Sequence, residues 1–134
     1  MIVAHAHYST RDPDRLDITR AGCDRLIAAG KEAPGVILAP SARLVYPTLR
    51  RLKEARSLAE RKAIFDVYRR DYLAEIERNF ALWTYRFDPL FARTRIVGVC
   101  FCAPDPEDGV LRCHRVLAAE WLAAHGATNI GAVP

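Results

Sequence analysis

Apolar and polar positions along this chain follow two different periods, and the first predicts β-strands. Loose alternation over Ile2–Tyr8 predicts a first strand, and the short apolar run Val36–Leu38 predicts a second. The nearly continuous apolar run Ile96–Cys102 is rich in β-formers and is typical of a central strand buried on both faces. The tail Ala127–Pro134 can add a short edge strand.

The second period, three to four residues, predicts helices between these strands. The predicted segments are Ala21–Ala29, Ala42–Ala55, a long helix from Ser57 to about Leu82, and Leu111–His125. Ser57 and Glu60 match a capping box at the start of the long helix. Pro47 suits the first turn of a helix, so it interrupts or restarts the second segment.

Strands that alternate with helices predict one α/β domain over residues 1–134. Its sheet is small, parallel or mixed, with three to four strands flanked by helices. Ligands of such sheets lie beyond the carboxyl ends of the strands. Three loops would gather there: Ser9–Asp14, Ala39-Pro40-Ser41, and the loop that follows Cys102.

Composition is that of an ordinary globular domain. Hydrophobic residues make up 51% of the 134 residues, which is enough for a core. No apolar run approaches the ~20 residues that span a bilayer, and Met1–His7 has no signal-peptide pattern. We therefore expect a cytoplasmic protein with no membrane partner, in which the four cysteines are thiols, metal ligands or reactive groups rather than disulfides.

The formal net charge is +4, and 13 of the 20 basic residues lie between Arg43 and Arg95. This basic middle admits anionic partners, nucleic acid among them. Acidic residues are interleaved with the basic ones, however, as on an ordinary solvated helix face.

Cys113-His114-Arg115, at a predicted helix start, is the main candidate for chemistry. A helix N-terminus attracts anions and lowers the pKa of a thiol placed there. Cys113 can then be a nucleophile, His114 a proton donor or acceptor, and Arg115 a fork for phosphate or carboxylate. The alternative is a buried cysteine, a capping histidine and a surface arginine.

A second candidate cluster is Asp17, Thr19 and Arg20. Asp17 can serve as a general base or bind a sugar hydroxyl, while Arg20 can hold a phosphate. The alternative is a helix cap by Asp17 or Thr19 beside a surface salt bridge. Ser41, after Pro40, is a ligand-binding candidate that is most simply a helix cap.

The remaining cysteines leave two further possibilities. Cys100, Cys102, Cys113 and His114 are residue types that zinc accepts, but their spacing is not a usual zinc-binding pattern. Adjacent Cys113 and His114 on a helix would also point about 100° apart. A redox pair of Cys102 and Cys113 is the other possibility. We expect no resident metal and no cofactor.

Several of these motifs together resemble the family named domain of unknown function 488 (DUF488), in its short phage and bacterial form. The resemblance rests on the ordered motifs Leu16–Arg20, Ala39–Ser41, Tyr68–Tyr72, Cys100–Cys102, Cys113–Arg115 and Gly126-Ala127. It covers most of the chain and implies an α/β fold. It also implies one shared pocket for seven residues: Asp17, Thr19, Arg20, Ser41, Cys113, His114 and Arg115.

The expected function is the binding of an anionic small molecule, nucleotide-like or phosphorylated, between the Leu16–Arg20 loop and the Cys113 helix start. Hydrolase or transferase activity is an open possibility, with Asp17, Cys113 and His114 as catalytic residues and Thr19, Arg20, Ser41 and Arg115 as ligand contacts. The alternative is a phage-type module that binds protein or nucleic acid through the basic middle. The chain has no P-loop, G-x-S-x-G or G-x-G-x-x-G motif.

Overall fold

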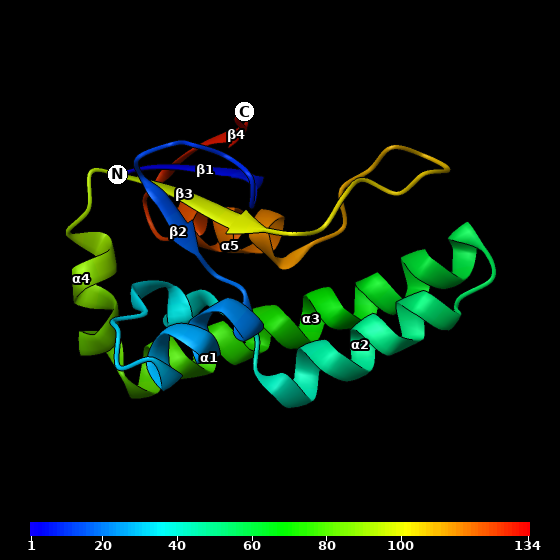
Figure 1. The fold of residues 1–134 in the computed structure, drawn as a ribbon, viewed down its shortest axis with the longest axis horizontal. Coiled ribbons are helices and arrows are strands. Elements are labelled where there is room, and N and C mark those ends of the chain that lie inside the picture. Colours follow the sequence, from blue (N-terminus) through cyan, green and yellow to red (C-terminus); the bar gives the residue numbers. More distant parts are fainter.

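A four-stranded parallel sheet organises the computed structural model, which describes residues 1–134 (Figure 1). The strands are β1 (Ile2–His7), β2 (Arg15–Asp17), β3 (Arg95–Cys100) and β4 (Thr128–Ala132). Their order in the sheet is β2-β3-β1-β4, and all three pairings are parallel. The prediction of one α/β domain with a small sheet is confirmed, and β4 is the edge strand expected in the tail.

The helices lie mostly between β2 and β3 in the chain. They are α1 (Arg20–Ala28), α2 (Ala42–Glu54), α3 (Leu58–Leu82), α4 (Asp88–Phe91) and α5 (His114–Ala124), with 3₁₀ turns η1 (Pro34–Leu38) and η2 (Thr84–Phe87). Helices α2 and α3 form an antiparallel hairpin that extends away from the sheet (Figure 1). None of the helices combines the length and the apolar character needed to cross a membrane.

The main core lies where α5 packs against β1, β3, β4 and α3. Leu117 and Trp121 of α5 meet Tyr72 and Ile76 of α3 in one buried cluster. The buried residues of α3, Tyr68, Tyr72 and Ile76, recur every four residues, which is the spacing of a helix face that packs into the core. The Tyr72 hydroxyl donates a 2.6 Å hydrogen bond to the Leu38 carbonyl, which ties η1 to α3.

The second predicted strand is wrong. Val36–Leu38 belongs to η1, because Pro34 at its start has no N–H for a sheet ladder and Gly35 packs directly on β2. A Cβ at Gly35 would lie 1.9 Å from the Asp17 carbonyl oxygen. The actual second strand is Arg15–Asp17, within a segment that is too short and too polar for its alternation to be distinctive.

The observed helix ends differ from the predicted ones by at most three residues. Pro47 lies inside a continuous α2 and does not divide it. The Ser57 hydroxyl accepts from the Glu60 N–H as expected, whereas the Glu60 carboxylate accepts from the N–H of Arg56, not that of Ser57. Helix α5 starts later than predicted, at His114, so Cys113 is its N-cap with an extended backbone (φ −155°, ψ 151°).

Candidate functional site

Two hollows lie at the carboxyl ends of β2 and β3, and between them they contain most of the predicted functional residues. The first, here called the thiol pocket, is a cavity of about 160 Å³ between α1, α2, α3 and α5. The second, called the β2 groove, is an open hollow of about 640 Å³ along β2 and α1. Phe101, which follows β3, lines both of them.

The thiol pocket brings together four of the seven predicted residues. Thr19 and Arg20 come from the start of α1, and Cys113 and His114 from the start of α5. Thr19 caps α1, since its hydroxyl accepts from the Gly22 N–H at 3.0 Å. The shared pocket expected for these two segments therefore exists for Thr19, Arg20, Cys113 and His114.

Three cysteines meet at one wall of this pocket. The Sγ atom of Cys100 lies 3.4 Å from that of Cys102 and 3.2 Å from that of Cys113. All three Sγ atoms lie within 4.8 Å of one another, and all three residues are free thiols. Strand β3 positions Cys100 at its last residue, and the loop from 101 to 112 returns the chain so that Cys113 meets it.

His114 is buried next to this cluster. Its Nε2 lies 2.8 Å from the Ile18 carbonyl oxygen, so Nε2 carries the hydrogen and donates it. Its Nδ1 is then an acceptor, 3.7 Å from the Cys113 Sγ. Burial lowers the pKa of His114, so the neutral ring is favoured.

The thiols do not titrate independently. Hydrogen bonds shared with Cys102 and Cys113 lower the pKa of Cys100. Hydrogen bonds with Cys100 and Cys102, and then burial, raise the pKa of Cys113. The hydrogen bond with Cys100 raises the pKa of Cys102 to about 11. The three thiols therefore form one coupled group, and the raised pKa of Cys113 does not favour an isolated thiolate at that residue.

Tyr68 of α3 also lines the thiol pocket. It is only 6% exposed, and its hydroxyl has no hydrogen-bond partner. Its pKa is raised, first by burial and then by the nearby thiols of Cys113, Cys100 and Cys102. The pocket therefore contains an unused polar group close to the sulfur cluster.

Arg115 does not reach the thiol pocket, contrary to the expectation that it contacts ligand. Its guanidinium is 6% exposed and points under the sheet, because residue 115 lies on the face of α5 that packs against β1 and β3. Nη1 donates to the carbonyl oxygens of Ala6 at 2.5 Å and Cys100 at 3.1 Å. These bonds join the ends of two strands, so the side chain is structural and is not free to hold an anion.

Ser41 and Asp17 also lie outside the thiol pocket. The Ser41 side chain does not cap α2; its Oγ donates to Glu75 of α3 at 2.6 Å, and its N–H donates to the same carboxylate at 2.8 Å. Because Val36–Leu38 is not a strand, the Ser41 loop does not end at the sheet. Asp17 lines the β2 groove instead.

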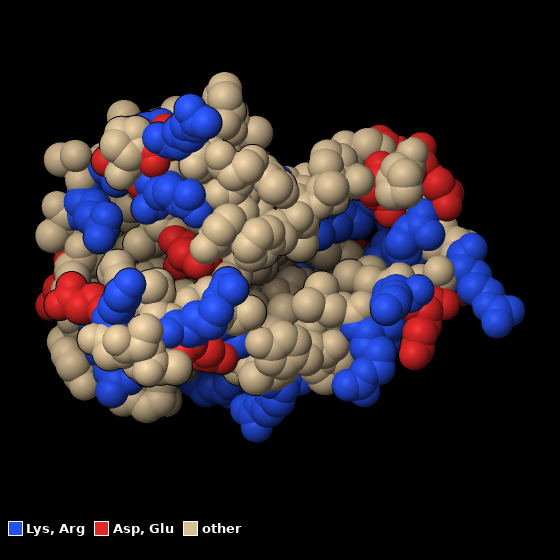
Figure 2. Space-filling view, in the orientation of Figure 1, with Lys and Arg blue, Asp and Glu red and all other residues tan.

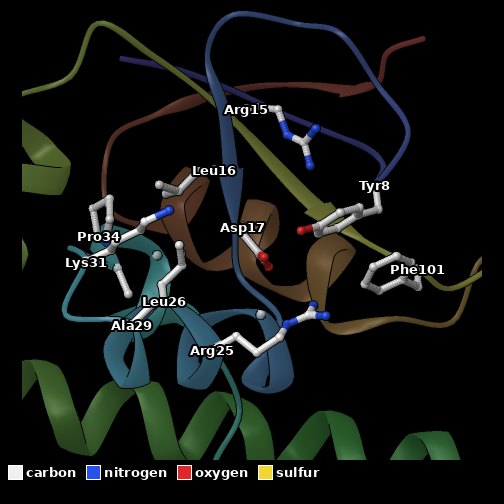
Figure 3. A pocket seen from close by; sticks show the side chains of 13 residues that line it. Tyr8, Arg15, Leu16, Asp17, Arg25, Leu26, Ala29, Lys31, Pro34 and Phe101 are labelled. Atoms are coloured by element: carbon white, nitrogen blue, oxygen red, sulfur yellow. The ribbon is translucent and has the colours of Figure 1, made fainter.

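The β2 groove is open and carries charge (Figure 3). Arg15 of β2, Arg25 of α1 and Lys31 after α1 line it, and none of the three forms an ion pair with a carboxylate. Asp17 is the only acidic residue of its lining. The cations of the thiol pocket differ, since Arg20 pairs with Asp24, and Arg112 with Asp108.

Two aromatic rings close one side of the groove. Tyr8 and Phe101 stack with their centroids 4.0 Å apart, and the Arg15 guanidinium lies 4.7 Å from the centroid of the Tyr8 ring. Phe101 is 54% exposed, so part of its ring faces solvent. Figure 3 shows the Asp17 carboxylate and the Arg25 guanidinium directed into the space beside these rings.

Asp17 is held by the start of α1. Its Oδ1 accepts from the N–H and the hydroxyl of Thr19, at 2.9 and 2.7 Å. Its Oδ2 lies against Gly22, where a Cβ would come within 2.0 Å of it. Glycine at position 22 therefore allows the carboxylate to lie on the helix, with Oδ2 left without a hydrogen-bond donor.

The loop between β3 and α5 covers one end of the thiol pocket. Arg61 of α3 binds the carboxylates of Asp105 and Glu107, at 2.7 and 2.6 Å, and Arg112 binds Asp108. Figure 2 shows the acidic side chains of this loop beside basic ones of the helical hairpin. These ion pairs hold the long loop in place, so its length does not separate Cys102 from Cys113.

Sequence reasoning missed the groove residues Tyr8, Arg15, Arg25, Lys31 and Phe101. A signal was present only for Phe101, an aromatic residue just beyond a buried strand. The basic residues look like any solvated charge in the sequence, and only the fold shows that they converge without carboxylate partners.

Comparison of this chain with family models, with curated proteins and with solved structures finds no match. The resemblance to DUF488 therefore stays a prediction. Function has to be inferred from the geometry of the two hollows.

Proposed function

We propose that this protein binds an anionic, nucleotide-like small molecule in the β2 groove. The observation that carries this proposal is one open hollow lined both by three cations without carboxylate partners, Arg15, Arg25 and Lys31, and by an exposed aromatic ring. A hollow of about 640 Å³ is within the usual range for small-molecule and cofactor sites. The ligand class is the one expected from the sequence, but Arg20 and Arg115 are not its anchors.

The three cations suit phosphate groups. Arginine presents a planar fork that bonds two phosphate oxygens at once, and lysine adds a point charge. Because the three side chains have no carboxylate partners, phosphate binding breaks no ion pair of the free protein. The electrostatic energy gained from binding phosphate is then not reduced by the loss of existing ion pairs.

The remaining groups of the groove suit a base and a sugar. The exposed face of Phe101 offers a stacking surface, and stacking of a base on an aromatic ring contributes about 1–3 kcal/mol in single-strand binding proteins. The free Oδ2 of Asp17 can accept a hydrogen bond from a sugar hydroxyl. Asp17 is also the only groove carboxylate available as a general base, so any hydrolase or transferase activity would depend on it.

The test is a calorimetric titration with AMP, ADP and inorganic pyrophosphate at low salt. We expect ADP to bind more tightly than either AMP or pyrophosphate, because it offers both a base and two phosphates. Arg25→Gln should weaken ADP binding about tenfold, which corresponds to ~1.4 kcal/mol. Arg50→Gln, a matched change on the exposed surface of α2, should leave ADP affinity unchanged.

Two results would contradict the proposal. One is the absence of heat with all three probes at millimolar concentration. The other is an equal loss of affinity in the Arg25 and Arg50 variants, which would mean attraction to net charge and not to the groove.

A second candidate function is nucleic-acid binding by α2. Four basic residues of this helix form no ion pair: Arg43, Arg50, Arg51 and Lys53. Figure 2 shows basic side chains along the edge of the molecule where α2 lies. If α2 is the contact surface, the double variant of Arg50 and Arg51 to Gln should weaken binding of a mixed-sequence oligonucleotide and reduce its salt dependence, while Arg25→Gln should not.

A further inference from the structure

The cluster of Cys100, Cys102 and Cys113 is not used by the ligand site proposed above. Its three sulfurs come from two consecutive elements, β3 with its following turn and the N-cap of α5, which the loop between them brings together. Cys100 and Cys113 are buried, and Cys102 is half-buried. The cluster is therefore the strongest unexplained feature of the molecule.

The spacing of the sulfurs fits a metal ion. Zinc binds thiolate sulfur at about 2.3 Å in tetrahedral geometry, which places neighbouring sulfurs about 3.8 Å apart. Here two of the Sγ–Sγ distances are 3.2 and 3.4 Å, and all three sulfurs lie within 4.8 Å of one another. Lengthening the two short distances by about 0.4–0.6 Å would bring them to the spacing of zinc-bound thiolates.

The neighbouring cavity provides a second, independent observation. It is lined by the same three cysteines and by the Tyr68 hydroxyl, which is buried and has no partner. A metal ion held by three protein ligands keeps a fourth position for water or another ligand. A molecule in that position would face the cavity, within which the Tyr68 hydroxyl is the free hydrogen-bonding group.

The surroundings also suit the charge of such a site. Three thiolates and one Zn²⁺ leave a net charge of −1. The Arg115 guanidinium bonds the carbonyl oxygen of Cys100, and its Nε–H has no partner. This buried cation lies close enough to offset the charge, which gives Arg115 a role beyond joining two strands.

The position of Cys113 removes the objection that adjacent residues on a helix diverge. Cys113 is the extended N-cap and not a helical residue, so its side chain turns back toward β3. His114 lies within the helix and reaches only the Cys113 sulfur, at 3.7 Å. Its Nε2 donates to the Ile18 carbonyl, which holds the ring in place, and the histidine is not one of the three ligands proposed here.

We propose that Cys100, Cys102 and Cys113 bind one Zn²⁺ as three thiolates, with the fourth coordination position open to the thiol pocket. Binding displaces to solvent the protons that the three sulfurs still carry and involves no change of oxidation state. The site goes beyond the proposed nucleotide-binding function and does not depend on it. The open position would take water or a small anion or thiol that enters the pocket.

The test is metal binding by the full chain after reduction and removal of bound metal. We expect one equivalent of Zn²⁺ by elemental analysis, and with Co²⁺ a strong thiolate-to-cobalt charge-transfer band. Cys102→Ser is the main variant, because Cys102 is the partly exposed member of the cluster and its change is the least disruptive to packing. It should lower Zn²⁺ affinity at least a hundredfold, with an unchanged circular dichroism spectrum.

Cys23→Ser is the matched control. Cys23 is also buried but lies outside the cluster, with its thiol donating to the Asp17 carbonyl. It should retain one equivalent of Zn²⁺. Failure of the reduced protein to bind Zn²⁺, or equal loss in the Cys23 and Cys102 variants, would overturn the proposal.

The open position has its own readout. Addition of azide or a small thiol should change the visible spectrum of the Co²⁺ form, because a new ligand enters its coordination sphere. An unchanged spectrum would reject the open position. Arg25→Gln should alter ADP binding but not Zn²⁺ stoichiometry, so failure of either proposal can be distinguished from failure of the other.

Discussion

The β2 groove and the thiol pocket both include Phe101 in their linings, but they differ in the exposure and pairing of their polar side chains. In the groove the charged side chains are exposed and have no carboxylate partners. In the thiol pocket the cations are paired and the reactive groups are enclosed, with sulfur against sulfur. Unpaired exposed cations favour reversible binding of an anion, whereas enclosed thiols favour a tightly bound metal ion.

The two regions also differ in how the chain builds them. Every groove residue except Phe101 lies between Tyr8 and Gly35, on β2, α1 and the segments next to them. The thiol pocket takes residues from positions 19 to 114, so it depends on how the whole domain packs. We therefore expect changes in the core to damage the thiol pocket first and the groove last.

The largest expected effect is that of Arg115→Met. This change keeps the apolar stem but removes both hydrogen bonds that the guanidinium donates, to the carbonyl oxygens of Ala6 and Cys100, at a cost of about 3 kcal/mol. Urea unfolding should show a lower midpoint and Zn²⁺ affinity should fall, while the folded fraction still binds ADP. The exposed Arg93→Met is the control, with a change of less than about 0.5 kcal/mol. Equal stability of the two variants would mean that Arg115 does not join the strands.

An intermediate effect is expected from Gly22→Ala, which targets the groove alone. The new Cβ would meet Asp17 Oδ2 at 2.0 Å and Thr19 Oγ1 at 2.6 Å, so the carboxylate has to move. We expect stability to fall by about 1–3 kcal/mol. ADP affinity should also fall about tenfold, with one equivalent of Zn²⁺ still bound. Ala28→Ser, on the exposed surface of the same helix, is the control for ADP binding. Loss of Zn²⁺ in the Gly22 variant would show that the two regions are coupled.

The smallest expected effect is that of Asp108→Asn, at the ion pair that holds the loop over the thiol pocket. The hydrogen bond from Arg112 lowers the pKa of Asp108 to about 2, against an ordinary value of 3.8. The folded state thus binds this proton less readily than the unfolded state. The stabilisation is present above pH 3.8 and is lost as the pH falls from there through about 2.

Thermal unfolding of the wild type and the Asp108 variant, compared from about pH 6 to about pH 3, measures this contribution. The difference in Tm should be largest near neutral pH and should shrink below about pH 4. A difference that stays constant with pH would show that the carboxylate charge of Asp108 does not stabilise the loop.

Prediction from the sequence succeeded for elements whose hydrophobic pattern is long enough to define the face that is buried. β1, β3 and the long helix α3 have enough apolar residues at one period to specify their structure. It failed for β2, because three residues carry too little pattern, and for Val36–Leu38, where Pro34 and close packing on Asp17 decide the backbone.

The same division applies to the site. Helix-start chemistry pointed to Cys113, His114 and Thr19, which line one pocket in the structure, since capping and the N-terminus of a helix are local properties. Arg115 lies at a helix start too, but the side of the helix it occupies was not evident from one turn. The groove cations could not be found from the sequence, because whether a charge is paired depends on residues that are distant along the chain.

Taken alone, the sequence determined the α/β class, the strand that ends at the cysteines, and the helix start at Cys113. These follow from hydrophobic period, β-propensity and capping, which act over a few residues. Only the tertiary structure decided that Cys100, Cys102 and Cys113 meet, that Arg115 lies under the sheet, and that three cations line one groove. The reason is that long-range packing places side chains from separate elements together, and no local pattern records which of them will meet.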